Sequence, residues 1–326
     1  MPAVAIAREP AMFMRRSLVL CFAALPFAAR AQDMLAPGKR AWAAQVPEIR
    51  IGLLGGENDA DRLARYDGYR KLLEETFQVP AKMLMAADYA GVIQAFAAGQ
   101  IEVAYMSPAA YAAAWIQSNG DVEPLLTTEE KDGTTSYVSA MYVRADSGIT
   151  SLADMKGHSL AWADPNSASG YLIPRAEFRA QKLDPETYFS RTGFAGGHEQ
   201  AVIAVLNHQY DAGVTWTSGI GDVNEGYTRG ALRSMVEKKM LDMKDLRIIW
   251  TSRPIENGPL AVRKSTPEAF RADMLAFHLA LPKAHPDIYH AVDMGNGQAW
   301  VRVHQADYEV FIEMLKQEAA ERRKRN

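Results

Sequence analysis

Cysteine is almost absent from this sequence, since Cys21 is the only one among 326 residues. A single cysteine forms no intramolecular disulfide, and Cys21 lies in an N-terminal stretch that we expect to be cleaved off. Beyond that stretch, no apolar run reaches the roughly 20 residues that a membrane-spanning helix needs. Basic residues cluster only at positions 321–326, which argues against nucleic acid as a partner.

The common motifs of hydrolases are absent too. The sequence has no G-x-S-x-G turn, and the pair His198–Glu199 is not followed by the second histidine of H-E-x-x-H. His285 and His290 are too loosely arranged to indicate a metal site. We therefore expect no catalytic residue, no metal and no cofactor.

The first 31 residues have the three parts of a secretory signal peptide. Arg15 and Arg16 precede an apolar run at positions 18–29, and Ala29-Arg-Ala31 is a cleavage signature. The alternative is an ordinary N-terminal core helix. Cleavage after Ala31 predicts export to the periplasm and leaves 295 residues with a formal net charge of −6.

The remaining chain alternates strand and helix patterns. Residues 32–47 read as a leader, and an amphipathic helix with Leu63, Tyr66, Tyr69, Leu72 and Leu73 on one face follows the first strand. We expect strands at 48–54, 79–84, 101–106, 138–144, 158–163, 192–194, 212–215, 246–250 and 258–263, and helices alone from Thr266 onward.

Two such α/β series, joined by extended crossings, predict two lobes with a mixed sheet in each and a ligand cleft between them. The first lobe comprises residues 48–140 and 256–326, and the second comprises residues 141–255. Open α/β sheets bind ligands beyond the carboxyl ends of their strands, so loops from both lobes should face the cleft.

The segment Asp164-Pro-Asn-Ser-Ala-Ser-Gly170 joins a predicted strand to a predicted helix. Backbone N–H groups at a helix N-terminus favour an anion, Ser167 and Ser169 add hydroxyl donors, and Gly170 permits close approach. Plain helix capping is the other interpretation, because Ser, Asn and Asp are the usual capping residues.

A second turn, Gly196-Gly197-His198-Glu199, also begins a helix. The His198 imidazole could donate to an anion, and its protonation would then change affinity near neutral pH. A capping or buried structural histidine remains the alternative. Tyr89 at a helix start and Tyr137 before a crossing are further candidates, although a tyrosine in such a position is more often a core residue than a ligand contact.

In their order and spacing, these segments resemble the periplasmic substrate-binding proteins of ABC transporters for phosphonate, phosphite and phosphate. The resemblance covers residues 49–263. It rests on "DYAGVIQAF", "GQIEVAYMSPAAY", "SLADMKG", "DPNSASGYLIP" and "GGHEQAVIAVLNHQYDAG". It implies the type II fold of these proteins, with ligand held between the lobes and delivered to a membrane permease.

The resemblance also implies the ligand-binding residues, at the positions of this chain that match the family's: Tyr89, Tyr137, Ser167, Ala168, Ser169 and His198. At Ala168 relatives often have threonine, so a hydroxyl donor is lost there. Tyr105, Trp216 and Ser218 are possible walls of the pocket, although Tyr105 and Trp216 could equally be core residues.

Relatives that recognise aminoethylphosphonate place carboxylates near its amine. The matching positions here are Ser218 and Gly258, which favours a compact oxyanion such as phosphite, phosphate or methylphosphonate, although a shifted alignment would bring Glu256 to one of them. We expect a monomer. The alternatives are an enzyme that processes phosphonates or phosphoesters, and a sensor lobe with the same fold.

Overall fold

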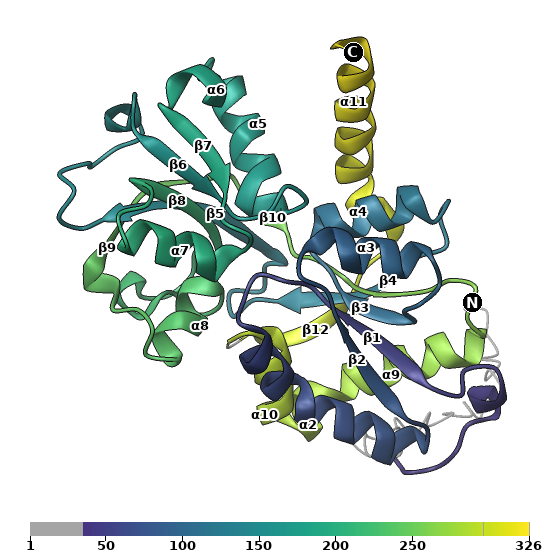
Figure 1. The fold of residues 1–326 in the computed structure, drawn as a ribbon. Coiled ribbons are helices and arrows are strands. Elements are labelled where there is room, and N and C mark those ends of the chain that lie inside the picture. Colours follow the sequence, from purple (N-terminus) through teal and green to yellow (C-terminus); the bar gives the residue numbers. More distant parts are fainter. Residues whose placement is uncertain (1–34, 296, 326) are drawn as a thin grey trace, which may run out of the picture.

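The computed structural model describes residues 35–295 and 297–325, so the expected signal peptide at 1–31 lies outside the described residues. The described chain forms two α/β lobes, each built on a six-stranded sheet (Figure 1). Both sheets combine parallel and antiparallel pairs, which confirms the expected fold class. Among the described helices, none is long and apolar enough to cross a bilayer.

The sheet of the first lobe contains β1 (Ile49–Leu53), β2 (Ala81–Met85), β3 (Val103–Tyr105), β4 (Glu123–Glu129), β11 (Leu260–Val262) and β12 (Ala299–Arg302). Their order is β12-β4-β11-β3-β1-β2, with β1 parallel to both its neighbours and β11 and β12 antiparallel to theirs. The helices are α2 (Asp59–Phe77), α3 (Tyr89–Ala97), α4 (Pro108–Gln117), α9 (Glu268–Ala284), α10 (Pro286–Asp293) and α11 (Glu309–Arg325), with short turns η1 (Ala41–Ala44) and η6 (Gln305–Tyr308).

The second lobe contains β5 (Ser136–Arg144), β6 (Ser159–Trp162), β7 (Arg191–Phe194), β8 (Ala212–Thr217), β9 (Leu246–Thr251) and β10 (Ile255–Glu256). Strand β6 is parallel to β7 and β8, whereas β5 is antiparallel to β8, β9 and β10. Its helices are α5 (Ile173–Ala180), α6 (Pro185–Tyr188), α7 (His198–Leu206) and α8 (Ala231–Glu237), and its short turns are η2 (Ala153–Met155), η3 (Ala168–Leu172), η4 (Val223–Glu225) and η5 (Met243–Asp245).

Two short segments connect the lobes, at residues 130–135 between β4 and β5 and at residues 257–259 between β10 and β11. Because β5 pairs only with strands of the second sheet, the expected lobe limit after residue 140 falls inside this strand. We therefore propose that the boundary between the first and the second lobe lies before Ser136.

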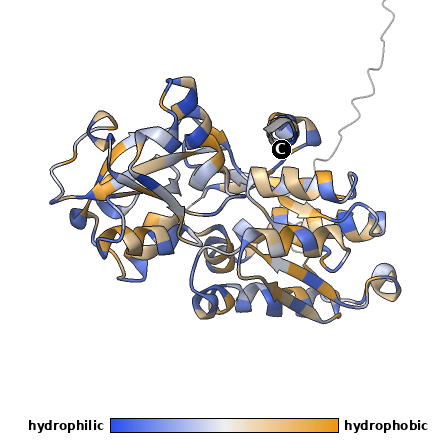
Figure 2. Cartoon of the chain, turned by 45° about the horizontal axis from the view of Figure 1, so that its top comes forward, coloured by the Kyte–Doolittle hydropathy of each residue, from blue (hydrophilic) through white to orange (hydrophobic). Residues whose placement is uncertain are grey.

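Helix α2 shows how the helices bury one face against the sheets. Tyr66, Tyr69, Leu72 and Leu73 are buried as their spacing predicts, whereas Leu63 is 41% exposed and departs from the expected face. Figure 2 shows the same alternation of hydrophobic and hydrophilic residues along the helices of both lobes. Burial of one apolar face is what holds such helices on a sheet.

Two expectations from the sequence are wrong. The end of the expected leader is part of the first lobe, because Trp42 is buried against Phe270 and its Nε1 donates to Asp273 Oδ2 at 2.7 Å. The chain after Thr266 is not purely helical, because β12 pairs with β4, itself a strand that the pattern did not predict. β12 has only four residues, so periodicity could not reveal it.

Candidate functional site

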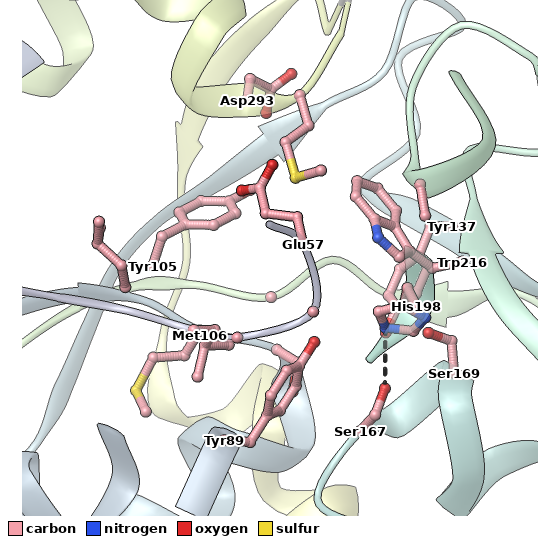
Figure 3. A pocket seen from close by; sticks show the side chains of 18 of the residues that line it. Glu57, Tyr89, Tyr105, Met106, Tyr137, Ser167, Ser169, His198, Trp216 and Asp293 are labelled. Carbon is pink, nitrogen blue, oxygen red and sulfur yellow. Dashed lines mark hydrogen bonds between the residues drawn. The ribbon is translucent and has the colours of Figure 1, made fainter. Parts of the chain in front are cut away.

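A cavity of about 120 Å³ lies between the lobes. A buried water needs roughly 10–15 Å³ on this measure, so the cavity has room for a small ligand. The structure brings most of the expected site residues together at its wall, and Figure 3 shows them approaching from both lobes. They are Tyr89, Tyr105, Tyr137, Ser167, Ser169, His198 and Trp216.

The serine loop leaves β6 and enters a π-helical turn, η3, ahead of α5. Ser167 is the N-cap of this turn, and its Oγ accepts a hydrogen bond from Gly170 N at 3.0 Å. A side chain at Gly170 would lie 2.9 Å from Ser167 Oγ and 3.0 Å from His198 Cε1, so the close packing requires glycine. Ser167 therefore both caps the turn and lines the cavity.

His198 begins α7 and is 5% exposed. Its Nδ1 lies 3.1 Å from Thr215 Oγ1, and its Nε2 lies 3.3 Å from Ser167 Oγ, the contact dashed in Figure 3. Burial lowers the pKa of His198 to about 4. In the ligand-free protein the imidazole is therefore neutral near pH 7, which argues against the expected protonation switch near neutral pH.

We expect the ring resonances of His198 in the ligand-free protein to stay constant from pH 8 down to about pH 5.5 in a nuclear magnetic resonance titration. His198→Gln identifies the signals. Since the folded pKa lies below that of the unfolded chain, His198 should also cost stability as the pH falls from about 6.5 toward 4. A titration midpoint of His198 above about pH 6 would contradict the prediction that its pKa is lowered.

Two tyrosines add hydroxyl donors. Tyr89 is the first residue of α3, after the N-cap Asp88, and its backbone N donates across the lobes to Asp164 Oδ2 at 3.3 Å. Tyr137 lies in β5 with its ring edge-on to Trp216. Burial raises the pKa of Tyr89 and of Tyr137 above the usual 10, so both hydroxyls keep their protons and can donate to an anion.

Two of the expected residues do not line the cavity. Ala168 is fully buried behind it, and the Ser218 hydroxyl bonds Thr228 Oγ1 at 2.8 Å instead, which corrects its placement in the wall. Gly258 does line the cavity, but a side chain there would collide with the carbonyl oxygen of Met106. Glu256, the acid that a shifted alignment would bring to this position, belongs to β10 and does not line the cavity.

Five charged residues at the cavity were missed as site residues in the sequence: Glu57, Arg65, Glu199, Arg229 and Asp293. Glu57 pairs with Arg65, and Arg229 lies 3.8 Å from Asp293, so their charges are largely matched. Glu57 could have been noticed, because it follows the glycines that end the first strand. Asp293 had no signal, since it ends an ordinary helix.

Comparison with known proteins points in one direction. The sequence profile of the family described as "ABC transporter, phosphonate, periplasmic substrate-binding protein" matches residues 51–308. The chain is 30% identical over 226 residues to the phosphate-import protein PhnD of Mycolicibacterium smegmatis, covering 65% of each chain. It is 27% identical over 239 residues to the phosphonates-binding periplasmic protein of Escherichia coli, covering 72% of this chain and 66% of that protein.

The matches thus span just under two thirds of the length of both relatives. Among solved structures, PhnD1 of Prochlorococcus marinus in complex with methylphosphonate has a TM-score of 0.71 at 15% identity, covering 84% of this chain and 98% of that one. Similarity at that identity shows the fold, whereas the profile match covers most of the sequence. The chain belongs to the family of periplasmic phosphonate-binding proteins of ABC transporters.

Proposed function

We propose that this protein binds one small phosphorus oxyanion in the cavity between its lobes and delivers it, chemically unchanged, to the membrane permease of an ABC importer. The protein would act in the periplasm after cleavage behind Ala31. The observation that carries the proposal is the convergence of Tyr89 from one lobe with Tyr137, Ser167, Ser169 and His198 from the other.

This set of donors suits a buried oxyanion. Burying a charge is costly unless its oxygens are hydrogen-bonded. The tyrosine and serine hydroxyls are neutral donors, and the N-terminus of α7 at His198 supplies the positive end of a helix dipole. Because the donors come from both lobes, only the closed form offers all of them at once, so ligand favours closure.

We infer a compact ligand such as phosphite, phosphate or methylphosphonate. No side chain fits at Gly258, and Ser218 is turned away, so neither position offers a carboxylate for an amine. The acids that do line the cavity already have cationic partners: Glu57 has Arg65, Glu199 has Lys238, and Asp293 has Arg229.

The contact between Ser167 and His198 also raises the possibility of a hydrolase. In a Ser-His-Asp triad, a carboxylate orients the histidine and stabilises its protonated form. Here the partner of His198 Nδ1 is the neutral hydroxyl of Thr215, and the pKa of His198 is about 4. Such a histidine is a poor general base at pH 7, which supports binding without turnover.

Isothermal titration calorimetry of the mature protein tests the proposal against phosphite, phosphate, methylphosphonate and aminoethylphosphonate. We expect one ligand per chain, with aminoethylphosphonate the weakest. Analysis of the recovered ligand by phosphorus resonance should show no new compound. The absence of heat with every ligand would refute the ligand class, and release of phosphate from a phosphonate would refute the assignment as a binding protein.

A further inference from the structure

One of the contacts between the lobes lies at a rim of the cavity, where the loop after β1 meets the start of α7. Glu199 N donates to Gly56 O at 3.1 Å, and Asn58 N donates to Glu199 Oε2 at 3.2 Å. A side chain at Gly197 would lie 2.6 Å from Gly56 Cα, so the two backbones are in close contact. The turn that carries His198 therefore packs directly against the first lobe.

Two buried carboxylates meet at this rim. Glu57 of the first lobe is 6% exposed, and Glu199 of the second lobe is 2% exposed. Both line the cavity. Arg65 of the first lobe pairs with Glu57, but Glu199 brings a second negative charge to the same rim. Like charges away from water repel each other strongly, so closure of the lobes needs a further cation here.

Lys238, the C-cap residue directly after α8 in the second lobe, lies between the two acids. Its Nζ is 2.6 Å from Glu199 Oε1, 3.3 Å from Glu57 Oε2 and 3.4 Å from Asp61 Oδ2. An ammonium group has three donors. Two of them donate to carboxylates on opposite lobes, Glu57 and Glu199, and Asp61 of the first lobe adds an ion pair.

We propose that Lys238 is an inter-lobe latch that holds the closed form and slows release of the bound ligand. Opening would separate Lys238 from Glu57 and Asp61 of the first lobe, while its contact with Glu199 of its own lobe can persist. The effect on ligand release rests on the proposed function. The effect on the position of the lobes does not, because it needs no ligand.

The first test measures ligand kinetics by stopped flow with methylphosphonate for Lys238→Ala and Lys238→Arg. Loss of a partly buried charge partner acts mainly on dissociation, so Lys238→Ala should speed dissociation about tenfold and leave association nearly unchanged. Lys238→Arg should restore part of the slow dissociation. Lys244→Ala, at a side chain that is 86% exposed, is the matched control and should behave as the wild type.

Slower association with unchanged dissociation would overturn the latch, because it would mean that Lys238 only attracts the anion. A second measurement separates the latch from the ligand class. Spin labels at exposed sites, one on each lobe, report the inter-lobe distance in the ligand-free protein, where Lys238→Ala should shift the distribution toward longer distances. An unchanged distribution refutes the latch, whereas a wild-type protein that binds no phosphorus oxyanion refutes only the proposed function.

Discussion

Ser167→Ala should bind methylphosphonate about a hundredfold more weakly than the wild-type protein, because a hydrogen bond to a charged group contributes about 1.5–3 kcal/mol. The hydroxyl has three roles at once. It lies at the cavity wall, it accepts from Gly170 N, and it lies 3.3 Å from His198 Nε2. Its removal takes away a ligand donor and loosens both the loop and the imidazole that it positions. Calorimetry measures the affinity.

Ser190→Ala is the matched control, since Ser190 is an exposed serine of the same lobe and does not line the cavity. Its affinity should equal that of the wild type. Thermal unfolding of the Ser167→Ala variant should stay cooperative, because loss of a cap costs only about 1 kcal/mol. If Ser167→Ala binds as tightly as the wild type, Ser167 caps the turn and has no part in the site.

Arg229→Ala should lower the free energy of unfolding by about 3–5 kcal/mol, the usual cost of removing one partner from a buried ion pair. Arg229 is 2% exposed and joins both crossing segments to α10. Its Nε donates to Glu130 Oε1 at 2.9 Å, and its Nη2 donates to Asn257 Oδ1 at 2.8 Å. Its Nη1 lies 3.8 Å from Asp293 Oδ1. Without Arg229, two buried carboxylates lose their counter-charge.

Urea unfolding measures this loss, and its pH dependence gives a second check. Burial raises the pKa of Asp293 to about 6, and Arg229 acts in the opposite direction. Removing Arg229 raises the pKa of Asp293 further, so protonation at lower pH relieves the unpaired charge. The difference in free energy of unfolding between the wild type and Arg229→Ala should therefore become smaller from pH 7 to pH 5. Arg253→Ala, at a side chain that is 84% exposed, should change stability by less than about 0.5 kcal/mol. An equal effect in the two variants would contradict a stabilising role for the ion pairs of Arg229 with Glu130 and Asp293.

The strand-loop-helix units could be predicted because their signals are local. The serine loop and the glycine turn before His198 both lie where their neighbours in the sequence placed them, at helix N-termini beside the cavity. β12 could not be predicted, because four residues are too few to show a period and the strand exists only through its pairing with β4. Leu63 has helical spacing, yet the fold leaves its side chain 41% exposed.

Which charged residues pair at the site could be learned only from the folded structure. Glu57 and Lys238 are 181 positions apart, and Glu130 and Arg229 are 99 apart, so nothing in the chain's local pattern pairs them. The pKa of His198 likewise depends on burial between segments that are distant in sequence. Residue type and spacing were enough to indicate an α/β protein of this family and the hydroxyl and imidazole groups that we propose as donors of an anion site. The electrostatic balance and the contact between the lobes arise only on folding, because charge pairing and desolvation depend on distance in space.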